Sequence, residues 1–294
     1  MTKPTLPELP SAIRTLTNDE SSALRTEHGE LPGPDHCVTC GGTGVFRWWS
    51  PGTRSAPVEW ECQCVDQWVL RRYLLYAGVG LTYARLGWLD YSGDSKGSAA
   101  AAEWLEDVDY TMRSGVGLTL YGTHGTGKTL IGALLLKGML ALGYSGYMTT
   151  FAHMIDLLAD GWRDSDAQQR FIALCKGTDV LLLDDIGQER HEERTYWDDK
   201  AKVARKVRTP KSLARSSLDE VLRYRLSNAK VTIITTNRDP QTDFAADYSE
   251  AIGSLVLERS HLCRLEGDDF RRAGLEARLR SEREMKLLRP VVLA

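Results

Sequence analysis

The chain has 294 residues, of which 42% are hydrophobic and 26% are charged. These fractions exclude wholesale disorder, and at about 150 residues per domain the length predicts two domains. The formal net charge is −3, from 37 basic and 40 acidic residues, which excludes histone-like binding by bulk positive charge but allows a local basic patch.

The N-terminal residues 1–30 are polar, contain three prolines, and predict a flexible tail. They contain no apolar segment typical of a secretory signal. The longest apolar stretch, residues 130–143, is interrupted by Lys137 and is too short to cross a bilayer. We therefore expect a cytoplasmic protein with no membrane contact, in a reducing compartment that disfavours disulfides.

Four cysteines follow the tail in the pattern C-x2-C-x21-C-x-C: Cys37, Cys40, Cys62 and Cys64. Four thiolates in two close pairs can hold one Zn²⁺ tetrahedrally, and a closed site of this kind is structural because no position is left for water. The sequence predicts a zinc-binding N-terminal domain over residues 31–90, including a linker helix. The alternative is that these are ordinary buried cysteines, which is the reading we prefer for Cys175 and Cys263.

Beyond the cysteines, apolar residues at helical spacing predict helices over residues 66–79 and 99–112, separated by a turn-rich break. Short apolar runs then alternate with helical stretches. They predict strands at residues 115–122, 145–151, 179–187 and 230–237, with a possible fifth at 260–267. Buried strands separated by helices indicate an α/β fold with a mostly parallel sheet covered on both faces.

The segment that joins the first strand to its helix reads GTHGTGKT, a full match to the phosphate-loop pattern G-x-x-x-x-G-K-[ST]. Its backbone N–H groups and the helix N-terminus attract phosphate. Lys128 is expected to reach the β- and γ-phosphates of ATP, and the Thr129 hydroxyl to ligate Mg²⁺. The loop residues expected to surround the nucleotide are Gly122, Thr123, His124, Gly125, Thr126, Gly127, Lys128 and Thr129.

Polar residues follow two later strands. The buried strand VLLLDD ends in Asp184, the expected Mg²⁺ partner, and Asp185, the expected general base for the attacking water. Because the aspartate side chain at this second position is shorter than that of glutamate, it extends less far towards the water, and we expect slow hydrolysis. Asn237 ends the strand VTIITTN, where it can orient the water and sense the γ-phosphate.

Between these strands, residues 190–215 carry nine basic and four acidic residues. One hypothesis is a basic arm that follows a single-stranded DNA backbone by salt-sensitive contacts. Its candidate residues are Lys200, Lys202, Arg205, Lys206, Arg208 and Lys211. The alternative is a solvated charged loop. The C-terminal stretch 271–289 is similarly basic and predicts an amphipathic or solvated helix.

The motifs LYGTHGTGKT, LLLDDIGQE, LDEVLRYRLSNAKVTIITTN and SHLCRLEGDDFR, in this order, resemble an AAA+ ATPase of the DnaC/DnaI-like helicase loader family, over about residues 70–272. The cysteine segment resembles the zinc-binding N-terminal domain of that family. The resemblance implies a three-layer α/β/α P-loop NTPase with a mostly parallel five-stranded sheet. It divides the chain into the zinc-binding domain, an AAA+ domain at 91–272 and a charged helix or tail at 273–294.

The resemblance also assigns arginines. Arg271, in GDDFR, matches the sensor-2 arginine, which contacts nucleotide. Arg225 matches a family arginine on the helix before the Asn237 strand. The arginine finger departs from the family pattern, because counting back from Gly267 reaches Ser254 and Leu255. Either Arg259 substitutes for it one turn later, or the finger is absent.

The resemblance implies an ATP-hydrolysing helicase loader that delivers a replicative hexameric helicase onto single-stranded DNA and assembles as a homo-oligomer, an open ring or spiral. Two alternatives remain: an IstB-like transposition helper that binds duplex DNA and a transposase, and a non-hydrolysing adaptor switched by ATP. Transposition helpers usually lack a zinc domain, so the cysteines favour the loader.

Overall fold

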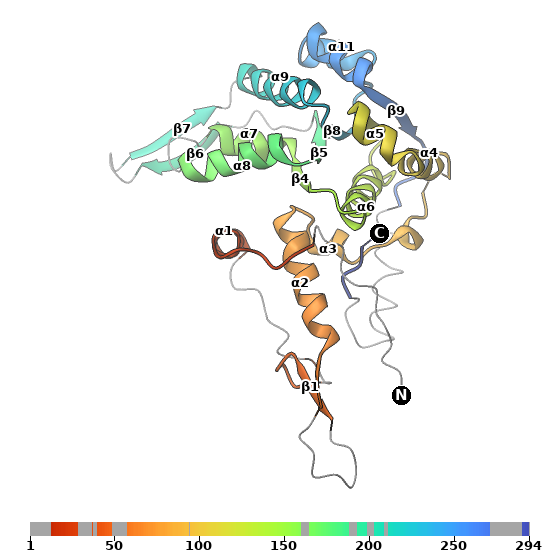
Figure 1. The fold of residues 1–294 in the computed structure, drawn as a ribbon. Helices are drawn as coiled ribbons and strands as arrows, with labels where there is room; N and C mark the ends of the chain where they lie inside the picture. Colours follow the sequence, from red (N-terminus) through yellow and green to blue (C-terminus); the bar gives the residue numbers. More distant parts are fainter. Residues whose placement is uncertain are drawn as a thin grey trace.

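The computed structural model describes residues 13–28, 37, 40–48, 58–93, 95–159, 165–187, 193–198, 203–208, 211–270 and 290–293. Five parallel strands form the main sheet in the order β4-β5-β8-β3-β9 (Figure 1). They are β3 (Gly117–Gly122), β4 (Gly146–Thr150), β5 (Val180–Ile186), β8 (Val231–Thr236) and β9 (Ser260–Leu265). The expected mostly parallel five-stranded sheet is therefore confirmed.

Helices cover both faces of this sheet because the side chains of each buried strand alternate between them. On one face, Leu182 and Ile233 pack with the phosphate-loop helix α6 (Lys128–Ala141), α4 (Ser95–Glu106) and α5 (Val108–Ser114). On the other, Leu181 and Leu183 pack with the remaining helices of the domain. These are α7 (Phe151–Ala159), α8 (Ser165–Gly177), α9 (Lys211–Ser227), α10 (Asp243–Asp247) and α11 (Glu250–Arg259).

The single helix expected over residues 99–112 is two helices in the structure. The backbone at Asp107 leaves the helical region, with φ −105° and ψ 45°, and Asp107 becomes the N-cap residue of α5. Aspartate favours such a position because its short polar side chain competes with helical hydrogen bonding.

The N-terminal part is a small hairpin followed by a helix. Strands β1 (Val45–Trp48) and β2 (Val58–Glu61) pair antiparallel, and α2 (Gln63–Tyr76) runs from them towards the main sheet (Figure 1). The turn after α2 reaches the edge strand, where the Met148 N–H donates to the Ala77 carbonyl at 2.8 Å. Helix α3 (Leu81–Ala84) and the short helix η1 (Trp88–Asp90) complete this connection.

Residues 13–28 differ from the flexible tail expected over 1–30. They include α1 (Asn18–His28), and Ile13, Leu16 and Leu24 are buried in the same core as α2 and α6. Sparse apolar residues in a polar segment can bury only against a partner distant in sequence, which local composition does not reveal. At the other end of the chain, Val291 is buried, and the Val292 N–H donates to the Ala84 carbonyl.

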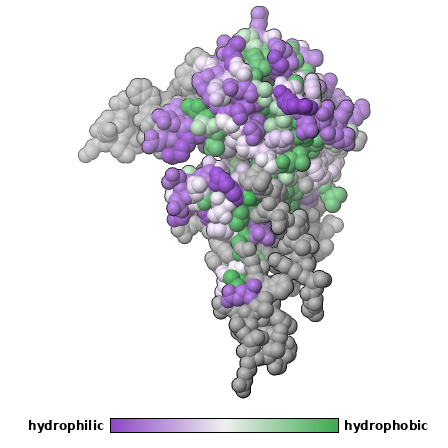
Figure 2. Space-filling view, viewed as in Figure 1, coloured by the Kyte–Doolittle hydropathy of each residue, from purple (hydrophilic) through white to green (hydrophobic). Residues whose placement is uncertain are grey.

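The basic insert contains a hairpin. Strands β6 (Glu193–Asp198) and β7 (Val203–Arg208) pair antiparallel and extend from the side of the molecule near α7 and α8 (Figure 1). On the face drawn in Figure 2, hydrophilic residues predominate and hydrophobic ones are scattered among them, as expected when the two cores hold most apolar side chains. Among the described residues, no helix is both long and apolar enough to cross a membrane.

Candidate nucleotide and metal sites

The phosphate loop lies between β3 and α6, at the carboxyl edge of the sheet. Gly122, Gly125 and Gly127 have φ values of +136°, +80° and +86°, a region that favours glycine, so their spacing follows from the backbone path of the loop. Lys128 is buried, and its ammonium donates to the carbonyls of Gly122 and Thr123. The lysine is thus held at the loop, while Thr123 and His124 are exposed.

The acid expected to hold Mg²⁺ lies against this loop. Asp184 is 4% exposed and accepts a hydrogen bond of 2.6 Å from the Thr235 hydroxyl. Burial, reinforced by the charge of Asp185, raises the pKa of Asp184 to about 6, although Thr235, Thr129 and Lys128 favour its charged form. A buried carboxylate beside a threonine hydroxyl fits Mg²⁺, which prefers oxygen ligands and lowers the cost of the negative charge.

Asp185 adopts an unusual backbone conformation, with φ +56°. The pairing of β5 with β8 shifts between Leu183 and Ile186, and the Asp185 N–H donates to the Thr235 hydroxyl at 2.9 Å. Such irregularities redirect side chains at the end of a strand. Asp185 is half-buried at the same edge as the phosphate loop.

Asn237 follows β8, which lies between β5 and the phosphate-loop strand β3. Asn237 is half-buried and, because of this strand order, lies at the sheet edge between Asp184 and Asp185 on one side and the phosphate loop on the other. Strand order thus brings together three sequence segments that are more than 50 residues apart. Thr235, whose hydroxyl connects Asp184 and Asp185, was not expected from the sequence, since threonine in a strand carries no specific signal.

Of the three arginines that the resemblance singles out, the two that the structure describes, Arg225 and Arg259, lie away from this site. Arg259 is the last residue of α11, and Ser260 after it pairs with Gly117 at the start of β3. The phosphate loop begins at the other end of β3, about 16 Å away at 3.3 Å per residue. The Arg259 side chain is 47% exposed, and its guanidinium pairs with Glu258 at 3.2 Å. Leu255 packs against the second core, and Arg271 lies outside the described residues.

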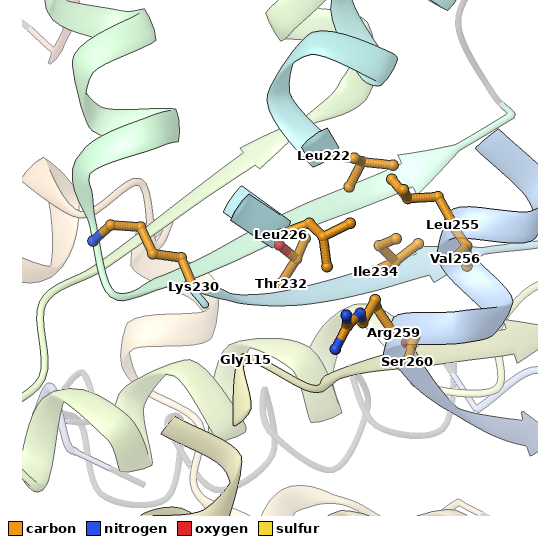
Figure 3. A pocket seen from close by; sticks show the side chains of 10 residues that line it. All are labelled: Gly115, Leu222, Leu226, Lys230, Thr232, Ile234, Leu255, Val256, Arg259 and Ser260. Atoms are coloured by element: carbon orange, nitrogen blue, oxygen red, sulfur yellow. The ribbon is translucent and has the colours of Figure 1, made fainter. Parts of the chain in front are cut away.

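A small pocket lies at this opposite edge (Figure 3). It is lined by α9, α11 and β8, and by Gly115, Arg259 and Ser260. The pocket is therefore distinct from the nucleotide site. Beside it, Arg225 is 1% exposed and donates to the carbonyls of Cys175, Thr178, Asp179 and Val231. These contacts give Arg225 a structural position between α8 and β8.

The four N-terminal cysteines converge. Their sulfur atoms all lie within 4.8 Å of one another, with Cys37 to Cys62 at 3.7 Å and Cys40 to Cys64 at 3.5 Å. Tetrahedral zinc with Zn–S bonds of about 2.3 Å places sulfur atoms about 3.8 Å apart, so the cluster fits this ion. Burial and the neighbouring thiols raise the pKa of Cys64, and a cation would offset that cost.

The surrounding backbone explains how the sulfurs meet. Gly41, Gly42 and Gly44 have φ values of +60°, +86° and +72°, which turn the chain after Cys40. The Cys62 N–H donates to the Gly44 carbonyl at 2.8 Å, and Cys64 lies in the first turn of α2. The two remaining cysteines, Cys175 and Cys263, are buried in the separate cores, as expected.

Among the basic-insert candidates, Lys200 and Lys202 lie outside the described residues. Arg205, Lys206 and Arg208 lie in β7, and Lys211 begins α9. In the hairpin register Arg205 is opposite Tyr196 and Lys206 is opposite Thr195. Three of the candidates therefore belong to an ordered two-stranded ribbon rather than an irregular loop.

The chain has a parallel sheet between two layers of helices, with a phosphate loop after one strand and paired acids after another. This arrangement defines a P-loop NTPase fold of the AAA+ kind. No family model matches the chain. The chain is similar to the replicative helicase loader DnaI of Bacillus subtilis (strain 168), with 26% identity over 138 residues. That match covers 47% of this chain and 38% of the relative, so the chain spans well under half of the relative's length.

Solved structures support the same fold. The structure titled DnaC helicase loader matches with a TM-score of 0.50 and 23% identity, over 64% of this chain and 100% of that chain. The structure titled DnaI matches with a TM-score of 0.51 and 18% identity, over 64% and 94%. The resemblance to DnaC/DnaI-like helicase loaders is thus confirmed by sequence and by fold.

Proposed function

We propose that the chain is an ATP-binding and ATP-hydrolysing helicase loader. The observation that carries this proposal is the meeting of Lys128, Thr129 and Asp184 at one buried site within the AAA+ fold. The similarity to DnaI and DnaC supports the loader role over the transposition helper. In this account the protein delivers a replicative hexameric helicase onto single-stranded DNA.

In this proposal each residue of the site has a separate task. Lys128 and the loop N–H groups bind the phosphates of ATP. Thr129 and Asp184 would hold Mg²⁺, which offsets phosphate charge. Asp185 accepts a proton from the attacking water, and Asn237 orients that water.

We infer that hydrolysis is completed between subunits. Arg259 is exposed at the sheet edge opposite its own phosphate loop, so it cannot serve its own nucleotide, whereas it can serve that of a neighbour in an open ring or spiral. Leu255 is packed internally and offers no such group. The position of Arg259 favours an ATPase over the non-hydrolysing adaptor.

The N-terminal zinc domain is proposed to contact the helicase. The cysteine cluster lies at the start of α2, and the other end of this helix is bonded to the edge strand of the ATPase sheet. A partner bound near the zinc site is thereby connected to the nucleotide-binding domain through one continuous helix. Because α2 and α6 share one core, the proposed domain boundary at residue 91 separates two functions rather than two independently packed units.

Nucleotide titration and single-turnover hydrolysis test the ATPase part directly. Lys128→Ala should weaken ATP binding by about 100-fold or more through loss of a charge-assisted contact, with the exposed Lys96→Ala as matched control. Asp185→Asn should retain binding but slow hydrolysis by about 100-fold or more. Unchanged affinity in Lys128→Ala would contradict the nucleotide site, and unchanged hydrolysis in Asp185→Asn would contradict the role of the base.

A further inference from the structure

The residues that follow β9 lie across the phosphate loop. The last residue of β9, Leu265, pairs with Gly122, and the chain then turns at Gly267, where φ is +126°. The Phe270 N–H donates to the carbonyl of Gly125 at 3.2 Å, so the segment 267–270 is bonded to the tip of the loop. Gly267 also lies against the Phe270 ring, which packs this turn upon itself.

This arrangement places a carboxylate at the loop. A Cβ added to Gly125 would lie 2.2 Å from the Asp269 carboxyl carbon and from one of its oxygens. Gly125 is therefore needed for its positive φ and also because Asp269 occupies the adjacent space. The preceding residue, Asp268, is also exposed. The three atoms nearest to a Cβ added to Gly125 all belong to Asp269 and none to Asp268.

A second side chain from outside the loop, Tyr91, also lies against it. Its ring would lie 2.6 Å from a Cβ added to Gly127, and its hydroxyl donates to the Thr126 carbonyl at 3.4 Å. Thr126 is fully buried. The loop thus has an acidic side chain next to Gly125 and an aromatic ring next to Gly127.

An acid beside a phosphate loop works against its ligand. The loop N–H groups and helix N-terminus attract negative charge, whereas a carboxylate repels it. ATP carries more negative charge than ADP, so the repulsion is larger for the triphosphate. Asp269 is exposed, and Gly267 and Asp268 before it are exposed as well, so the charge lies at the surface of the loop.

We propose that Asp269 is a specificity-determining residue that lowers affinity for ATP more than for ADP. The proposal rests on the proposed nucleotide site. Asp269 thus places a negative charge beside a loop whose N–H groups and lysine attract phosphate.

The test compares Mg·ATP and Mg·ADP binding to Asp269→Asn, with Asp268→Asn as a matched removal of one charge. At roughly 7 Å in water each unit of ligand charge changes affinity by about threefold, so Asp269→Asn should tighten ATP by about five- to tenfold and ADP by about threefold. The gain should shrink at 0.5 M salt, because screening weakens repulsion between exposed charges. Asp268→Asn should change either affinity by less than about twofold.

Two outcomes would overturn the proposal. An unchanged affinity in Asp269→Asn, with wild-type thermal stability, would show that the carboxylate does not act on the nucleotide. A weaker affinity that is equal for ATP and ADP would show that Asp269 accepts a hydrogen bond from the ligand instead. Nucleotide binding by Lys128→Ala, measured in parallel, separates these results from failure of the proposed nucleotide site. If that site is wrong, Lys128→Ala binds ATP as tightly as the wild type; if only the role of Asp269 is wrong, Lys128→Ala still binds ATP weakly.

Discussion

At the scale of single residues, buried charged side chains occur both in the candidate nucleotide site and in the packing between helices and sheet. Asp184 is buried where a cation and phosphate are expected, whereas Arg225 is buried among main-chain carbonyls. Burial lowers the pKa of Arg225 to about 10, yet its many hydrogen bonds hold the guanidinium in place. The first residue is proposed to serve chemistry, and the second joins α8 to β8.

Replacing Arg225 tests this structural role. Arg225→Ala should lower the free energy of unfolding by about 3 kcal/mol or more, because it leaves several buried carbonyls without a donor. Urea denaturation measures this loss. Arg223→Ala is the matched control: its partner Asp219 is one helical turn away on the exposed face of α9, and losing this ion pair should change the free energy of unfolding far less than Arg225→Ala does. Equal effects of the two substitutions would contradict the assignment.

The sequence predicted residues whose signal is local and missed those whose role depends on distant contacts. Lys128, Asp184 and the cysteines belong to short motifs in which spacing carries the chemistry. Tyr91, Thr235 and Asp269 meet the site only after strands and turns far apart in sequence come together. No residue type or spacing distinguishes them beforehand.

At the scale of elements, α6 is joined to the N-terminal connection by a buried lysine. Lys137 is fully buried and donates to the carbonyls of Tyr83 and Leu86, where α3 ends. Desolvation lowers its pKa to about 8, although Asp90 favours the charged form. The helix that begins at the phosphate loop is thus bonded to the segment that leads to the zinc site.

This contact predicts a pH dependence. Between about pH 8 and pH 10.5 the unfolded chain keeps the Lys137 proton that the folded chain has lost, so stability rises with pH in this window. The stability of the wild type relative to Lys137→Met should therefore increase by about 1–2 kcal/mol from pH 8 to pH 10. Denaturation of both proteins across this range provides the measurement, and parallel curves would refute it.

The basic insert is the element that the sequence described least well. Charge counting indicated a basic segment, but the pairing of β6 with β7 depends on register, which alternation in this polar segment specifies weakly. An ordered ribbon holds its cationic positions at fixed spacing. This supports the proposed contact with the backbone of single-stranded DNA.

Charge reversal at Lys202, Arg205 and Lys206 should weaken single-stranded DNA binding by about tenfold or more at low salt and reduce the salt dependence. Fluorescence anisotropy at several salt concentrations measures both quantities. Reversal of the exposed Lys96, Arg113 and Arg264 makes the same change in net charge elsewhere and should have a smaller effect. Equal losses in the two triple variants would leave the insert as a solvated segment.

At the scale of the whole molecule, the two predicted domains are less separate than the sequence indicated. The parallel α/β fold followed from apolar strands that alternate with helices, and the structure confirms it. By contrast, α1, α2 and residues 291–293 pack with α3 and α6 around one core. Such packing between distant segments is set by three-dimensional contacts that periodicity does not encode. In this account it connects the zinc site to the nucleotide site.

The most direct measurement of the loader account is retention of a replicative hexameric helicase, encoded in the same genome, by the full chain immobilised with ATP and Mg²⁺. The account predicts retention by the wild type, with about one zinc per chain by metal analysis. Cys37→Ser/Cys40→Ser should lose both zinc and helicase, whereas Cys175→Ala/Cys263→Ala should keep both. No retention by a zinc-loaded, ATP-binding wild type would contradict the central claim.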